Sequence, residues 1–172
     1  MQKGFPVRKH QRLKSFDYNS NGAYHITICV QNRREFLGRI VGRDALGTPF
    51  AELSEYGKII YNEIMQIPFY YKNIEIDKFV IMPNHVHMII IVKNNGNEGI
   101  GVPGASRPTA IIPNVVGILK RKTNKIYGFK MWQTGYYDHI IRDEADYLQV
   151  WQYIDNNPAK WTEDEYFTEL TS

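Results

Sequence analysis

Two histidines stand one residue apart inside an apolar run, MPNHVHMIIIV, which spans residues 82–92. Alternate residues of a β-strand point to the same side of a sheet, so the Cβ atoms of His85 and His87 are expected about 7 Å apart on one face. Two imidazoles at that distance can bind one divalent metal ion. Taken alone, such a pair is more often two hydrogen-bonded core or surface histidines, and a metal site requires a third ligand.

Candidates for that ligand lie in DYLQVWQYIDNNPAKW, residues 146–161. Tyr153 and Asn157 are four residues apart, which on a helix places them about 40° apart around the axis, at an end marked by Pro158. Two imidazole nitrogens and one amide oxygen suit Mg²⁺ or Mn²⁺, held partly by a substrate phosphate, better than a structural zinc ion. The alternative is that Tyr153 packs in the core and Asn157 caps the helix.

The formal net charge is +3, but the charges are unevenly distributed. Residues 1–20 hold five Lys/Arg against one acid, residues 107–130 hold six Lys/Arg and no acid, and residues 143–172 hold eight acids against one Lys. Two basic segments favour a polyanionic partner such as nucleic acid, although solvated helix faces would have the same composition. The predicted phosphate-binding residues are Lys120, Arg121, Lys122 and Lys125.

Several classes of protein are excluded by composition. The chain has 172 residues and no apolar stretch of about 18 residues, so no transmembrane helix is expected. The basic N-terminus lacks the apolar core of a signal peptide. Cys29 is the only cysteine, which excludes a disulfide scaffold and a thiolate zinc site and predicts a cytoplasmic location.

The hydrophobic pattern predicts an α+β fold, with an antiparallel sheet of ferredoxin-like or RRM-like order and helices packed on it. One domain is expected over residues 1–172, with a core of about 20–162 and a basic arm at 1–20. Ser54 and Asp143 are the predicted N-caps of the first and last helices, and Pro68 is predicted to end the first. Strands are predicted at 22–31, 74–82, 85–93 and 136–141, a short hairpin at 37–41 and 50–53, further helices at 113–127 and 144–156, and a Gly-, Asn- and Pro-rich loop at 94–108.

Two blocks of sequence, FVIMPNHVHMIIIV and WQTGYYDHIIRDEADYLQVWQYIDNNPAKW, resemble the REP-associated tyrosine transposases of bacteria. These are relatives of the small single-tyrosine insertion-sequence transposases, in the HUH endonuclease superfamily. YHITICVQNRREFLG also fits the first strand and turn of that family, so the resemblance covers about residues 20–162. It implies a ferredoxin-like core and a metal-dependent attack on single-stranded DNA. His85 and His87 are then the histidine ligands, Tyr153 the nucleophile, and Asn157 the third ligand, where the insertion-sequence relatives usually have Gln.

The same resemblance implies the reaction and the partner. Attack by the tyrosine leaves a 5′-phosphotyrosine and a free 3′-OH, and a second 3′-OH then completes strand transfer. The expected partner is single-stranded DNA, bound by a monomer or a homodimer.

 Hairpin-forming single-stranded DNA is therefore the predicted substrate.

Other tyrosines compete with Tyr153 for the role of nucleophile. Tyr136 and Tyr137 precede DHIIR on a predicted strand and lack a ligand at helical spacing, and Tyr147 lies on another face of the closing helix. Three further tyrosines, Tyr18, Tyr70 and Tyr71, are candidates for stacking on unpaired bases.

Two functions other than a DNA transposase remain open at this level. A non-catalytic single-stranded nucleic-acid-binding module on an RRM-like sheet would share the sheet and the charge pattern, but it would carry aromatic residues where this chain has histidines. A metal-dependent enzyme acting on a small molecule would have no need of the basic segments.

Overall fold

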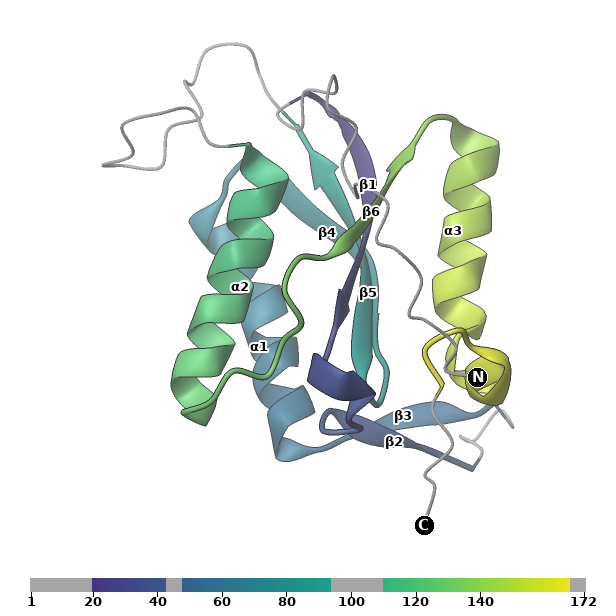
Figure 1. The fold of residues 1–172 in the computed structure, drawn as a ribbon. Coiled ribbons are helices and arrows are strands. Elements are labelled where there is room, and N and C mark those ends of the chain that lie inside the picture. Colours follow the sequence, from purple (N-terminus) through teal and green to yellow (C-terminus); the bar gives the residue numbers. More distant parts are fainter. Residues whose placement is uncertain (1–19, 43–47, 94–109, 168–172) are drawn as a thin grey trace, which may run out of the picture.

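The centre of the molecule is a four-stranded antiparallel sheet with the strand order β4-β5-β1-β6 (Figure 1). The structure is a computed structural model that describes residues 20–42, 48–93 and 110–167. Strand β1 (Gly22–Cys29) pairs with β5 (His85–Val92) on one side and with β6 (Tyr137–Ile141) on the other, and β4 (Ile74–Ile81) lies outside β5. This order is that of the split βαβ fold, so the predicted ferredoxin-like arrangement is confirmed.

Helices cover both faces of the sheet. Helices α1 (Glu55–Tyr70) and α2 (Ile111–Tyr127) lie on one face, and α3 (Glu144–Asn156) lies on the other (Figure 1). The predicted short hairpin is present: β2 (Gly38–Val41) pairs with β3 (Phe50–Leu53) in a two-stranded sheet separate from the main one. Two short 3₁₀ helices, η1 (Gln31–Arg33) and η2 (Pro158–Glu163), follow β1 and α3.

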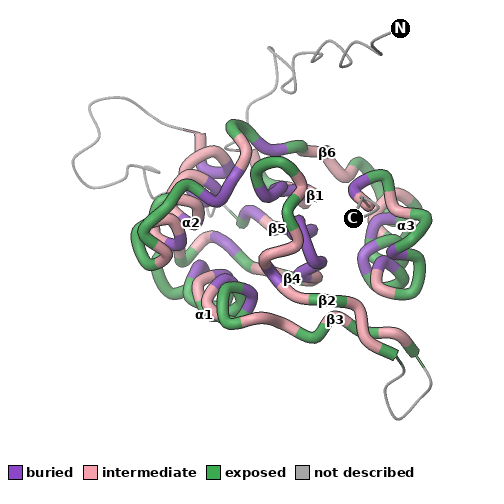
Figure 2. Tube along the Cα trace, turned by 60° about the horizontal axis from the view of Figure 1, so that its bottom comes forward, coloured by how far each residue is buried: buried purple, intermediate pink, exposed green. Residues whose placement is uncertain are grey.

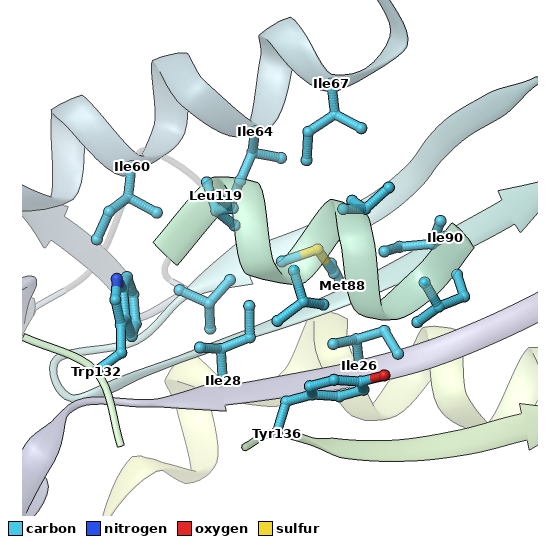
Figure 3. Packing of buried hydrophobic residues seen from close by; sticks show 14 of the residues in the cluster. Ile26, Ile28, Ile60, Ile64, Ile67, Met88, Ile90, Leu119, Trp132 and Tyr136 are labelled. Atoms are coloured by element: carbon cyan, nitrogen blue, oxygen red, sulfur yellow. The ribbon is translucent and has the colours of Figure 1, made fainter. Parts of the chain in front are cut away.

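The alternation of side chains along the strands explains both layers. One set of residues on β1 and β5, including Ile26, Ile28, Met88 and Ile90, packs against α1 and α2 (Figure 3). The opposite set includes Ile89, which packs with residues of α3. Because both faces of β5 are covered, its sequence is apolar almost throughout and the strand is buried along nearly its whole length (Figure 2).

The helix starts follow the predicted caps. The Ser54 hydroxyl accepts a hydrogen bond from the Gly57 amide at 3.2 Å, and the Asp143 carboxylate accepts one from the Asp146 amide at 2.8 Å. Each cap satisfies a donor that the first helical turn leaves free. Helix α3 ends at Asn156, before Pro158, as predicted.

Two predicted helix boundaries are wrong. Pro68 does not end α1, which continues to Tyr70, because the loss of one N–H does not prevent the Tyr71 amide from bonding the Ile67 carbonyl at 3.0 Å. Helix α2 begins at Ile111 rather than at residue 113, and Pro113 lies in its first turn. The backbone N–H groups of a first helical turn have no partner within the helix, whichever residues stand there. The missing N–H of proline therefore costs the helix little stability.

Other predictions fall outside the described residues. The basic arm at 1–20 lies there except for Ser20, as does the whole of the loop predicted at 94–108. The single domain over residues 1–172 therefore stays a prediction. Within the described ranges, no helix combines the length and the apolar character that crossing a membrane requires.

Candidate active site

Pairing of β1 with β5 brings a group of polar side chains together on the face that α3 covers. His87 lies opposite Thr27, and its Nδ1 is 2.8 Å from Thr27 Oγ1 and 3.1 Å from His25 Nε2. The ring centroids of His85 and His87 are 4.5 Å apart, so the predicted shared face is confirmed. The burial of His87 is almost complete, which excludes a solvated surface pair.

His85 lies against the C-terminal part of the described chain. Its ring centroid is 4.6 Å from that of Tyr166, and its Nδ1 is 2.9 Å from Asn84 Oδ1. Its Nε2 is buried and has no hydrogen-bond partner among the described residues. An imidazole nitrogen in that condition is suited to a ligand that completes the site.

Tyr153 reaches this group from α3. Val150 and Ile154 are buried against the sheet and hold the helix there, while Tyr153 is 41 % exposed. Its hydroxyl oxygen is 3.3 Å from His87 Nε2. Burial, and next the negative charges of Asp164 and Glu165, raise the pKa of Tyr153 to about 12, so the phenol is protonated at neutral pH.

A carboxylate that the sequence analysis missed completes the group. His85, His87 and Asp164 each place a possible ligand atom within 4.8 Å of the others. Asp164 follows η2, and its carboxylate accepts hydrogen bonds from the Tyr166 amide at 2.6 Å and from Asn157 Nδ2 at 2.9 Å. The acidic residues after α3 were considered in the sequence only for their charge. Trp161 and Tyr166, on either side of Asp164, are buried, and these two aromatic residues were the sequence feature that could have indicated a packed segment there.

Asn157, the predicted third ligand, lies beside Asp164. It is 3 % exposed, and its Oδ1 is buried without a hydrogen-bond partner in the described part of the chain. Its ligand role stays a prediction, and Asp164 is a second candidate for the same position. Two imidazoles with carboxylate and amide oxygens are a donor set that fits Mg²⁺ or Mn²⁺.

The histidines are held in the neutral form that metal binding requires. Burial lowers the pKa of His85 to about 3, assisted by the nearby positive charge of Arg33. Burial, and next the charge of His139, lowers the pKa of His25 to about 4. The pKa of His87 is also lowered, mainly by burial. Protons therefore do not compete with a cation for these nitrogens near neutral pH.

A cleft of about 620 Å³ opens beside Tyr153 and His87. Its volume is in the range of ligand-binding pockets in proteins. Amide side chains at the C-terminal half and end of α3 line it together with charged residues of η2 and the segment after it; these residues are Gln149, Gln152, Asn156, Asn157, Lys160, Glu163, Asp164 and Glu165.

The predicted phosphate-binding residues lie elsewhere, on α2 and thus on the opposite side of the sheet (Figure 1). Lys120 donates to the carbonyls of Gln133, at 2.9 Å, and Gly135, and burial lowers its pKa to about 8. Lys122 pairs with Glu63 at 3.2 Å. Arg121 and Lys125 are exposed. None of the four lines the cleft, and their role in DNA binding stays a prediction.

Most of the other tyrosines are engaged in packing. Tyr136 is 6 % exposed in the main core, and the Tyr147 hydroxyl donates to Asp77 at 2.6 Å. Tyr137 is 41 % exposed, and its ring centroid is 6.3 Å from that of Tyr166. Tyr71 packs against the core and Lys122 lies over the ring of Tyr70, whereas Tyr18 lies outside the described residues.

Comparison with known proteins identifies relatives of the whole chain. No protein-family model matches it. An uncharacterized protein of Haemophilus influenzae is 34 % identical over an aligned length of 181 residues, gaps included, and the match covers 96 % of each chain. A second Haemophilus influenzae protein, provisionally named a REP-associated tyrosine transposase, is 23 % identical over 147 residues, or 84 % of this chain and 74 % of that protein.

The fold has a solved counterpart. The structure of a REP-associated tyrosine transposase bound to a REP hairpin superposes with a TM-score of 0.64 at 20 % identity, covering 90 % of this chain and 74 % of that one. The predicted resemblance is therefore confirmed. The chain belongs to one family with the uncharacterized Haemophilus influenzae protein, and it is similar in sequence and in fold to the REP-associated tyrosine transposases.

Proposed function

We propose that the protein is a metal-dependent endonuclease and strand transferase of single-stranded DNA, with Tyr153 as the nucleophile. The observation that carries this proposal is the distance of 3.3 Å between the Tyr153 hydroxyl and His87 Nε2, beside a group of possible metal ligands made up of His85, His87 and Asp164. A module that only binds nucleic acid has no need of this arrangement on a buried strand.

The reaction exchanges one phosphate ester for another. The Tyr153 oxygen forms a bond to phosphorus while the bond from phosphorus to the 3′ oxygen breaks. The phenol gives up its proton in this step, and the 3′ oxygen takes one up as it leaves. A 3′-OH that later attacks the phosphotyrosine restores the phenol and joins the strands, so no external energy source is needed.

The chain supplies position and a ligand set. His85, His87 and Asp164, with Asn157 beside them, would hold the Mg²⁺ or Mn²⁺ ion. Such an ion, when bound, polarises a phosphoryl oxygen and offsets the charge that develops. Helix α3 holds Tyr153 in the lining of the cleft, and the reaction requires a phosphate placed there in line with the Tyr153 oxygen.

Hairpin-forming single-stranded DNA is the proposed substrate. This is supported by the similarity to a transposase whose structure holds a REP hairpin. The two basic segments of the sequence provide charge for the DNA backbone.

The test is incubation with labelled hairpin DNA and Mn²⁺, followed by denaturing gels and mass spectrometry of the labelled peptide. The wild type should form a covalent adduct that maps to Tyr153. Tyr153→Phe should form none and should still bind DNA, because only one oxygen is removed. Tyr137→Phe is the matched control, since Tyr137 is equally exposed, and it should form the adduct. Binding without any adduct would instead favour the non-catalytic nucleic-acid-binding module.

A further inference from the structure

Asn84 is fully buried in the tight connection between β4 and β5, and its side chain has a fixed orientation. Its Nδ2 donates to the Tyr166 carbonyl at 2.8 Å and to the Arg33 carbonyl at 3.2 Å. Carbonyl oxygens only accept hydrogen bonds, so the amide nitrogen must face them. Asn84 Oδ1 therefore faces the other way, toward His85 Nδ1 at 2.9 Å.

This orientation determines the tautomer of His85. An amide oxygen cannot donate, so the hydrogen in this contact belongs to His85 Nδ1. A neutral imidazole carries one N–H only, and Nε2 is left with a free lone pair. Nε2 is the atom of His85 that is buried without a hydrogen-bond partner among the described residues.

His87 has no comparable constraint. Its Nδ1 faces the Thr27 hydroxyl and His25 Nε2, and each of these groups can donate or accept. Both tautomers of His87 are compatible with its neighbours. The two histidines of the pair are therefore unequal, and the difference comes from Asn84.

We propose that Asn84 is a positioning residue that holds His85 in its Nδ1–H tautomer and so presents the Nε2 lone pair to the metal ion. Hydrogen-bond partners of this kind commonly fix the ligands of metal sites. The same amide binds the Tyr166 carbonyl, two residues from Asp164, so it ties His85 to the segment that carries the carboxylate. The ligand role of His85 rests on the proposed function, whereas its tautomer does not.

The first measurement needs neither metal nor substitution. Long-range ¹H–¹⁵N correlation spectra of the wild-type protein at pH 7 should show His85 with a protonated Nδ1 and a bare Nε2. A protonated Nε2 on His85 would overturn the proposal. His87 provides an internal reference in the same spectrum.

The second measurement compares variants in the same spectra and in Mn²⁺ titrations followed by calorimetry. Asn84→Ala should lose the tautomer preference and bind Mn²⁺ about 10–100-fold more weakly. Asn84→Asp keeps an acceptor for Nδ1–H, so it should keep the tautomer and bind Mn²⁺ at least as well as Asn84→Ala. Asn62→Ala, on the exposed side of α1, is the control and should match the wild type.

The outcomes separate two failures. Unchanged Mn²⁺ affinity in a folded Asn84→Ala would overturn the positioning role. If Asn84→Ala does not fold, a change of tautomer in Asn84→Asp would overturn it as well. A wild type with the Nδ1–H tautomer and no Mn²⁺ binding would overturn the metal site of the proposed function, while the tautomer assignment itself would be supported.

Discussion

At the scale of single residues, the structure adds most to the sequence by supplying a new candidate for the third metal ligand. Asp164 lies with His85 and His87, and it accepts a hydrogen bond from Asn157. A hard divalent cation favours a charged carboxylate oxygen over a neutral amide oxygen, because the charge adds attraction in a buried site.

Asp164→Asn is therefore expected to weaken Mn²⁺ binding by about 10-fold or more. Loss of a residue that only hydrogen-bonds a metal ligand typically costs about 10–100-fold in affinity, and loss of a ligand's charge should cost at least as much as the lower value. The side chain keeps its shape and loses its charge. Calorimetric titration measures the effect, and Glu163→Gln is the control, because Glu163 lines the same cleft outside the ligand group. Equal losses of Mn²⁺ affinity in both variants would mean that the total negative charge of the cleft attracts the ion, and that Asp164 is not a ligand.

Acid should destabilise the metal-free protein through its buried histidines. The pKa values of His25 and His85 in the folded state are about 4 and about 3, against about 6.5 in an unfolded chain. At a pH between the folded and unfolded pKa values, these two histidines are protonated in the unfolded chain and neutral in the folded one. The free energy of unfolding therefore falls as the pH decreases from about 6.5 toward 4, by at most about 1.4 kcal/mol per pH unit for each histidine.

Urea unfolding midpoints at pH 7 and pH 5 measure this dependence. His25→Gln removes one of the titrating groups, so its midpoint should fall less than that of the wild type over the same interval. A variant with the pH dependence of the wild type would show that His25 does not contribute.

At the scale of elements, the start of α1 depends on a close approach of backbones. A Cβ on Gly57 would lie 2.1 Å from the Leu37 carbonyl oxygen and 3.2 Å from Leu53 Cβ. Ser54, which caps the same helix, also donates to the Phe36 carbonyl at 2.6 Å. The helix start and the β2–β3 hairpin are thus packed as one unit.

Gly57→Ala should accordingly destabilise the protein by about 1–3 kcal/mol, the usual cost of overpacking. Urea denaturation gives the free energy of unfolding. Gly42→Ala is the matched control and should change it little, because a Cβ there has no heavy atom within 4 Å. Stability equal to that of the wild type in Gly57→Ala would mean that the hairpin moves away at little cost.

The same elements show what sequence patterns can and cannot predict. Alternation on β1 and caps at Ser54 and Asp143 are local signals, and the strands and helix starts follow them. Asp164 reaches the site only because buried Trp161 and Tyr166 hold the segment after α3 in place. Such long-range packing leaves no periodic pattern in the sequence. The four-residue separation from Tyr153 therefore indicated Asn157 as a ligand, and nothing in the spacing indicated Asp164.

At the scale of the whole molecule, the exposed cations of α2 and the cleft beside Tyr153 lie on different sides of the sheet. Arg121 and Lys125 are exposed on α2, whereas the cleft is lined by three acids, Glu163, Asp164 and Glu165, and by Lys160. An acidic wall repels phosphates that no cation neutralises. A DNA strand that contacts both regions must therefore pass around an edge of the sheet.

This separation predicts that affinity and chemistry can be changed independently. Replacing Arg121 and Lys125 together by Gln removes two of the proposed phosphate contacts, each worth about 0.7 in the log–log salt slope on single strands, so the slope should flatten by about 1.4. Fluorescence anisotropy with labelled hairpin DNA over a series of salt concentrations measures it. Arg39→Gln is the control, because its charge is already paired with Glu52 at 2.6 Å.

Adduct formation at saturating DNA should stay at the wild-type rate, since Tyr153 and its neighbours are untouched. An unchanged slope would place the DNA backbone away from α2, and a slower reaction at saturation would show that α2 also orients the strand in the cleft.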